Sequence, residues 1–316
     1  MEIFRHLDDR SLSLRGSVAT LGNFDGVHRG HQALLRSAVD DSRRLETPCV
    51  VLTFEPHPLK VLAPVRAPKL ILSHKDKMEL LQSFGVDIVV IQKFDASFAS
   101  LSARDFVDRV LVDQLKIKKI WVGQDLRFGQ GRKGTVDDLV RWGAESGFTV
   151  GVVEPVLLNG VRVSSSRVRQ LIDEGRVDEA APMLGRFHFI SGRVVTGRRR
   201  GRELGFPTAN ISSRTEVLPL DGIYATLFQH GAKKFPSASN IGNNPTFGAG
   251  PRTVESFLLD FNDDLYSEPV KLFFVKRIRA EKRFASVDEL VAQMNQDVAR
   301  ARAIFDELGQ SAGSGA

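Results

Sequence analysis

The sequence predicts two domains of different class, α/β plus all-β: a domain built on a parallel sheet, then an antiparallel β-barrel with a long C-terminal helix. The chain has 316 residues, and single cores usually stop growing at roughly 250–300. Apolar strands alternate with helices up to residue 183, whereas later β-like segments are separated by Gly, Pro and Asn. We expect domains at 1–183 and 184–309 and a disordered tail at 310–316.

The elements of the first domain follow from apolar runs and helix-start signals. Helices are predicted after Ser73, Ser102 and Thr135, because each is a good N-cap with an acid three residues later. Near-continuous apolar strands indicate a parallel sheet covered on both faces, whose ligands bind at the carboxyl ends of the strands. The predicted strands are 18–21, 49–54, 86–91, 119–123 and 149–153, and the first helix is 29–44.

The second domain begins where the pattern changes. Short β-like segments start with 187–197 and continue to the run P-V-K-L-F-F-V-K-R-I. Such segments are typical of an antiparallel barrel. Ser286, with Glu289 three residues later, predicts a helix that ends near Leu308.

Composition restricts the classes of partner. Hydrophobic content of 42% is ordinary for a globular protein, and the N-terminus lacks the apolar core of a signal peptide. No run approaches the 18 or so apolar residues of a membrane span. Cys49 is the only cysteine, which agrees with a cytoplasmic location. A net charge of +6 suits small anions and is only weak evidence for a nucleic-acid partner, which we do not expect.

The stretch G-N-F-D-G-V-H-R-G-H, Gly22 to His31, follows the first predicted strand. His28 and His31 share one face at the start of a helix, where unpaired N–H groups attract anions. These residues predict a polyphosphate site and could stabilise charge on a phosphorus under attack. The pattern H-x-x-H alone is also compatible with half of a metal site.

Two further strings fall at strand ends, and a third imitates a known fingerprint. T-F-E-P-H-P places Phe54 and His57 where they could hold a flat heterocycle, or forms only a rigid connection. V-S-S-S-R-V-R offers hydroxyls and Arg169 to phosphates, or is only a helix cap. G-Q-G-R-K-G fits the G-x-G-x-x-G spacing, but it does not directly follow a strand, which argues against a dinucleotide site.

Together these strings resemble the adenylyltransferase module of prokaryotic bifunctional FAD synthetases, which have a Rossmann-like HxGH nucleotidylyltransferase fold. The resemblance implies transfer of the adenylyl group of ATP to FMN with release of pyrophosphate, with His28 and His31 acting in catalysis. Leu126 and Ser166 depart conservatively from the family pattern. The implied ATP-binding residues are Gly22, Asn23, Phe24, His28, His31, Ser164, Ser166 and Arg169, and the implied flavin-binding residues are Phe54, His57, Pro58 and Arg66.

In the second domain, four arginines lie between glycines just before G-F-P-T-A-N. The arginines alone would suggest a nucleic-acid patch or a solvated surface. In T-V-E-S-F-L-L-D-F, strict alternation puts Glu255 on the side of Phe257 and Leu259, where a carboxylate is costly unless it is functional or paired. The alternative is a glutamate at a strand end that reaches solvent.

The string G-F-P-T-A-N resembles the riboflavin kinase motif. The resemblance implies that Thr208 and Asn210 bind Mg²⁺ and ATP, that Gly197 and Arg202 also contact ATP, and that Arg279 borders the flavin. It implies Glu255 as the catalytic base. N-P-T-F-G and D-L-Y-S also match, although Ser267 replaces the usual glycine and suggests an altered turn.

From both resemblances we expect a bifunctional enzyme that phosphorylates riboflavin to FMN and adenylylates FMN to FAD. Its expected partners are riboflavin, FMN, FAD, ATP, ADP and pyrophosphate, with Mg²⁺ as cofactor. Two alternatives stay open at this point: a regulatory nucleic-acid-binding protein that uses the arginine run, and an enzyme with one working module.

Overall fold

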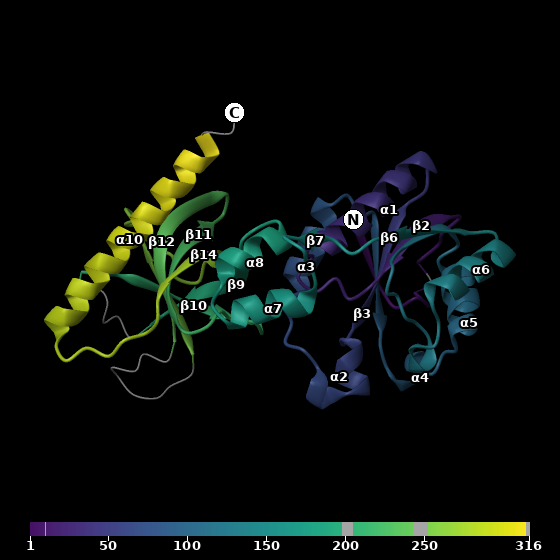
Figure 1. The fold of residues 1–316 in the computed structure, drawn as a ribbon, viewed down its shortest axis with the longest axis horizontal. Helices are drawn as coiled ribbons and strands as arrows, with labels where there is room; N and C mark the ends of the chain where they lie inside the picture. Colours follow the sequence, from purple (N-terminus) through teal and green to yellow (C-terminus); the bar gives the residue numbers. More distant parts are fainter. Residues whose placement is uncertain (10, 198–204, 243–251, 314–316) are drawn as a thin grey trace. The chain divides into compact units, whose positions relative to one another are not determined.

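The computed structural model describes residues 1–9, 11–197, 205–242 and 252–313. Contacts divide the chain into two compact units (Figure 1). The first comprises Met1–Lys69 and His74–Ser164, and the second comprises Leu70–Ser73 and Ser165–Ala316. The units therefore change at Ser164/Ser165, whereas the predicted first domain extends to residue 183. As a division of function, the boundary at 183/184 stays a prediction.

The first unit contains a six-stranded parallel sheet, as predicted, in the order β1-β4-β3-β2-β5-β6. From β2 the chain proceeds to β3 and β4 on one side and reaches β5 and β6 on the other. β2 and β5 therefore flank the point at which the strand order reverses, where ligands of such sheets bind. The strands are β1 (Glu2–Arg5), β2 (Ser17–Leu21), β3 (Cys49–Glu55), β4 (Ile88–Lys93), β5 (Ile117–Gly123) and β6 (Thr149–Val153).

The helices of this unit begin where the cap residues predict. Thr135 and Asp138 form a reciprocal capping box, and the Ser102 side chain accepts from the Asp105 backbone N–H. The helices are α1 (Arg29–Arg44), α2 (Pro58–Leu62), α3 (His74–Ser83), α4 (Ala96–Ala99), α5 (Ala103–Asp105) and α6 (Val136–Ser146), with a π-helix, η2 (Phe106–Gln114), and 3₁₀ turns η1 (Pro64–Arg66) and η3 (Gln130–Arg132).

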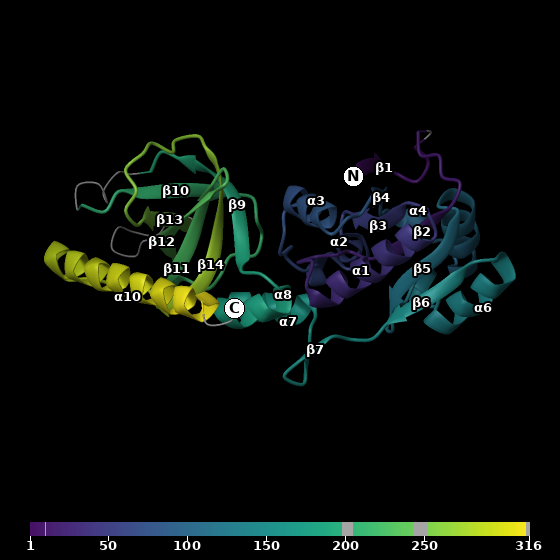
Figure 2. The same cartoon turned by 90° about the horizontal axis from the view of Figure 1, so that it is seen from above.

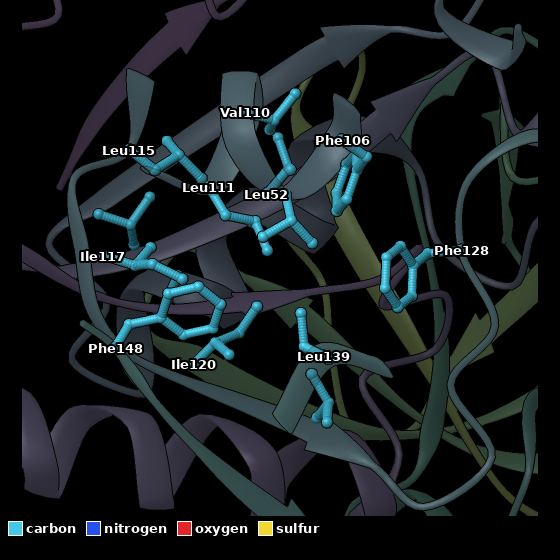
Figure 3. Packing of buried hydrophobic residues seen from close by; sticks show 14 of the residues in the cluster. Leu52, Phe106, Val110, Leu111, Leu115, Ile117, Ile120, Phe128, Leu139 and Phe148 are labelled. Carbon is cyan, nitrogen blue, oxygen red and sulfur yellow. The ribbon is translucent and has the colours of Figure 1, made fainter. Parts of the chain in front are cut away.

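One face of the sheet packs on η2 and α6 (Figure 3). Leu52 and Ile120 project from the strands into a cluster with Phe106, Leu111 and Leu139, all at most 4% exposed. Burying such side chains contributes roughly 1.5–3 kcal/mol each to folding. This core holds the carboxyl ends of the strands in fixed positions.

The G-x-G-x-x-G string has a packing explanation. A Cβ at Gly129 would lie 2.5 Å from the Ala103 backbone, and one at Gly134 would lie 2.8 Å from the Ala103 side chain and 2.9 Å from the Phe128 ring. These glycines let the loop approach α5. After the sheet comes a hairpin of β7 (Leu157–Leu158) and β8 (Val161–Arg162), whose Asn159-Gly160 turn has positive φ at both residues.

The second unit contains a closed antiparallel barrel, which confirms the predicted class (Figure 2). Its interior is filled by Val194, Ile211, Phe228, Val254 and Leu258 among others. In order around the barrel the strands are β10 (Thr208–Ser213), β13 (Thr253–Leu258), β12 (Lys233–Gly242), β11 (Gly222–His230), β14 (Pro269–Arg279) and β9 (His188–Val195).

In the described part of this unit, helices lie on both sides of the barrel strands in the chain order. Helices α7 (Ser165–Asp173) and α8 (Val177–Leu184) precede β9, and Val177 joins the barrel core. Helix α10 (Val287–Gly313) lies along the outside, with Ala301 and Ile304 against β11 and β14 (Figure 2). Helix α10 continues to Gly313, so the prediction of a disordered tail is wrong for residues 310–313. The glycine at position 309 does not end the helix, because a glycine inside a helix costs only about 1 kcal/mol. In the described ranges no helix is long and apolar enough to cross a membrane.

Candidate active sites

The turn after β2 forms the first candidate site. Phe24, Gly26 and Val27 all take positive φ, between 39° and 83°. Gly26 adopts this conformation without penalty, whereas the other two are held in it by burial. The chain then enters α1, whose N-cap is His28. The predicted helix of 29–44 is therefore confirmed, with both histidines at its start.

The two imidazoles stack on each other. Their ring centroids lie 3.7 Å apart and the planes differ by 17°. His28 Nδ1 accepts from the His31 backbone N–H at 3.4 Å, so the proton of a neutral His28 ring is on Nε2. A Cβ at Gly30 would lie 3.2 Å from the His28 ring, so glycine there makes room for it.

The environment of His31 favours the neutral ring. Burial lowers its pKa well below the ordinary value, and the nearby His28 and Lys77 lower it further. His31 Nδ1 is buried without a hydrogen-bond partner among the described residues. The pair thus offers polar ring atoms to an anion without bringing two full charges together.

Asn23 lies in the same turn, before His28, and contacts His57. The Asn23 amide is 3.0 Å from His57 Nε2, and His57 Nδ1 accepts from the Leu59 backbone N–H at 3.2 Å. A ring that accepts at Nδ1 donates at Nε2, so its partner is the amide oxygen of Asn23. The buried amide atom left without a partner in the described structure is then the NH₂ group, a donor suited to phosphate.

The predicted flavin-binding residues lie around the end of β3. Phe54 packs on Phe94 and Phe98, each with ring centroids 5.8 Å away. His57 is the N-cap of α2, with Pro58 as its first residue. Arg66 ends the short turn η1 and is exposed. The structure thus brings His57 to Asn23 and shows no such contact for Arg66.

The second candidate site is a row of side chains across neighbouring barrel strands. Glu255 on β13 is paired in register with Asn210 on β10 and with Asn240 on β12. Val254 and Leu258 point into the core, so these three residues lie on the outer face of the strands. Glu255 does share its face with Phe257, which packs edge-on against Phe206 at 5.2 Å.

Gly197 fixes the position of Asn210. A Cβ there would lie 2.1 Å from the Asn210 amide nitrogen and 2.5 Å from its Cγ. Only glycine therefore lets the Asn210 side chain lie against the chain after β9. Thr208 is two residues before Asn210 on the same face of β10.

Comparisons with known proteins assign each half of the chain to a family. A family model described as FAD synthetase matches residues 11–167, and one described as riboflavin kinase matches residues 184–305. The bifunctional riboflavin kinase/FMN adenylyltransferase of Escherichia coli (strain K12) is 42% identical over 92% of this chain and 93% of its own. The protein of the same name from Pseudomonas fluorescens is 41% identical over 96% and 98%.

The chain belongs to the family of bifunctional riboflavin kinase/FMN adenylyltransferases. Its FAD synthetase domain comes first and its flavokinase domain second. A crystal structure named as a macrolide-efflux protein from Streptococcus pneumoniae has the same fold, with a TM-score of 0.86, 33% identity and coverage of 96% of this chain and 99% of that chain.

Other predicted residues are not brought into these sites by described contacts. Ser164 follows Val163, whose backbone oxygen would lie 3.9 Å from a Cβ at Gly30, so Ser164 is near the start of α1. Ser166 and Arg169 lie on α7, in the second compact unit, and their approach to the histidines stays a prediction.

In the flavokinase domain, Arg279 is engaged by its neighbours. Its guanidinium forms two bonds to Asp297 on α10, at 2.8 and 2.6 Å, and one to the Ala280 carbonyl at 2.9 Å. It fixes α10 to β14, and a role toward the flavin stays a prediction. Arg202, the run 198–202 and the string 244–248 lie outside the described residues. Ser267 takes φ of 65°, so it keeps a glycine-type turn.

Two residues near these sites were not singled out by the sequence analysis. Lys77 donates to the Asn23 carbonyl, and Asn240 lies opposite Glu255 with its amide oxygen buried and unpartnered in the described structure. A lysine on an amphipathic helix carries no sequence signal of burial. Only the register of two distant strands reveals the place of Asn240.

Proposed function

We propose that the two domains act in succession on one flavin through the residues described above. The flavokinase domain phosphorylates riboflavin to FMN, and the FAD synthetase domain joins FMN to the adenylyl group of ATP. The observation that carries the residue assignments is the presence of one preformed polar cluster in each domain. Asn23, His28 and His31 form the first, and Asn210 with Glu255 forms the second.

In the FAD synthetase domain, the start of α1 and the histidine pair bind the phosphates of ATP. The FMN phosphate attacks the α-phosphorus, a bond forms to its oxygen, and the bond to the bridging oxygen breaks as pyrophosphate leaves. No protein nucleophile is needed, so catalysis comes from positioning and from stabilising charge at phosphorus. Because burial lowers the pKa of His31, that ring donates a hydrogen bond there without placing a second full charge beside His28.

In the flavokinase domain, Glu255 accepts the proton of the riboflavin hydroxyl as that oxygen attacks the γ-phosphorus and ADP leaves. Asn210 and Asn240 lie opposite Glu255 on the two neighbouring strands and flank it. The outer face of β13 gives the carboxylate access to substrate.

The residues of the second cluster suit Mg²⁺. Thr208 and Asn210 supply neutral oxygens on one face of β10, and hard cations already held by phosphate prefer such ligands. Bound Mg²⁺ would neutralise phosphate charge during transfer. In the first cluster, the described residues include no group of three or more His, Cys, Asp or Glu side chains suited to a metal. We also propose a cytoplasmic location, because ATP is a substrate and the lone Cys49 is a buried free thiol.

The test is a pair of variants assayed for both half-reactions. We expect His28→Ala to abolish FAD formation from FMN while FMN formation from riboflavin continues, and Glu255→Gln to do the reverse. Flavins are separated by chromatography, and circular dichroism checks the fold. A variant that stopped both reactions while folded would contradict separate sites.

A further inference from the structure

A buried lysine in the FAD synthetase domain has no role in the reaction described so far. Lys77 extends from α3 to the carboxyl ends of β2 and β3. Its Nζ donates to the Asn23 carbonyl at 3.3 Å and to Thr53 Oγ1 at 3.2 Å. Both acceptors are neutral, and Thr53 is fully buried. The ammonium group therefore lies at the floor of the first candidate site.

The charge of Lys77 is not balanced by a direct ion pair. In the described parts of the chain no carboxylate is bonded to it, and Asp25 and Glu55 act on it only through their fields. Burial lowers its pKa, and Lys77 in turn lowers the pKa of His31. A buried cation without a bonded counter-charge is destabilising unless an anion binds to it.

The third N–H of this ammonium group has no hydrogen-bond partner among the described residues. Two donors are used by Asn23 and Thr53, and an ammonium group has three. The unpartnered Nδ1 of His31 and the unpartnered amide atom of Asn23 belong to the same site. The phosphate groups of the two substrates, brought together at this site, could satisfy such a set of groups.

We propose that Lys77 binds the phosphate of FMN and holds it against the α-phosphorus of ATP. This inference rests on the proposed function of the domain. The reaction brings two anions together, so a cation between them lowers their repulsion. An FMN phosphate oxygen forms a bond to the α-phosphorus, and the bond to the pyrophosphate oxygen breaks. Charge is conserved, and no proton transfer is needed from the lysine.

The location of Lys77 indicates that it binds the phosphate of FMN and not the phosphates of ATP. The histidine pair and the N–H groups at the start of α1 provide the ATP side of the site. Lys77 is bonded to Thr53, which directly precedes Phe54, and both are at the end of β3 where the flavin-binding residues gather. The cation therefore lies where the incoming flavin nucleotide would enter.

The test separates charge from hydrogen bonding. Lys77→Gln retains a donor for Asn23 and Thr53 but removes the charge, whereas Lys77→Arg retains the charge. We expect Lys77→Gln to lower kcat/KM for FMN about 100-fold, with KM for ATP within about threefold of wild type. Lys77→Arg should keep at least about tenfold more activity than Lys77→Gln. Lys75→Gln is the matched control, because Lys75 lies on the same helix with 82% of its side chain exposed.

Two measurements on the same preparations report on folding: the rate of riboflavin phosphorylation and the melting temperature. If Lys77→Gln formed FAD as fast as the wild type, the proposal would be overturned. It would also be overturned if the only change were a higher KM for ATP. If His28→Ala still lost FAD formation, the function of the domain would stand while the Lys77 proposal failed. If His28→Ala also kept it, the function itself would fail.

Discussion

Replacing Gly197 by alanine tests the geometry of the flavokinase site. The new Cβ would lie 2.1 Å from the Asn210 amide nitrogen and 2.5 Å from its Cγ. Because carbon contacts are favourable only at about 3.5 Å, the amide must move by roughly 1 Å. A displacement of that size can reduce a positioned reaction about 100-fold, or about 2.7 kcal/mol in transition-state free energy.

The assay measures FMN formed from riboflavin and FAD formed from FMN, on the same protein. We expect kcat/KM for phosphorylation to fall about 100-fold while adenylylation is unchanged. Gly309→Ala is the control, because nothing lies within 4 Å of its Cβ position. Normal phosphorylation by a folded Gly197→Ala variant would refute the placement of Asn210 in the site.

Three further predictions concern stability. Burial lowers the pKa of His188 to about 3, so below pH 6.5 the unfolded chain binds a proton that the folded chain does not. Urea unfolding should therefore show that the free energy of unfolding falls by roughly 2–3 kcal/mol between pH 6.5 and 4.5. His188→Leu should abolish this decrease. Asp297→Ala leaves the Arg279 guanidinium, which is 21% exposed, without its carboxylate, and should lower the free energy of unfolding by about 3 kcal/mol. An unchanged free energy of unfolding would mean that α10 is held by its apolar face alone. Gly134→Ala should lower the melting temperature through an overlap costing about 1–3 kcal/mol, and an unchanged value would contradict the packing of this loop.

Local signals in the sequence located the starts of the helices that we predicted, but not α2, α4 or α8. Thr135 and Asp138 predict the start of α6 because their capping bonds join residues three apart. The 29–44 helix, the parallel sheet and the barrel are also confirmed. Strand β1 was not predicted, because Glu2–Arg5 is short, largely exposed and lacks an apolar run. Its place in the sheet comes from pairing with β4, far along the chain.

The candidate sites were predicted as far as neighbouring residues define them. His28 and His31 are three residues apart, so helix geometry brings them together. The contact of Asn23 with His57, and that of Lys77 with Thr53, joins residues 34 and 24 positions apart and depends on how strands and helices assemble. Asn240 beside Glu255 depends in the same way on strand register.

The placement of α7 and α8 also depends on contacts between residues that are far apart in the sequence. The sequence indicates a helix start near 163–169 but does not say which core the following residues cover. Val177 contributes to the barrel core, and Leu220 donates its backbone N–H to Ile172 on α7. These contacts group both helices with the flavokinase barrel in the compact unit, although they come before its first strand.

Mixing two inactivated variants shows whether two separate sites process the flavin in sequence. With riboflavin, ATP and Mg²⁺, the His28→Ala variant alone should accumulate FMN, and the Glu255→Gln variant alone should leave riboflavin unchanged. Their mixture should produce FAD, because FMN released by one variant is adenylylated by the other. A mixture that stops at FMN, although Glu255→Gln converts supplied FMN to FAD, would contradict the account.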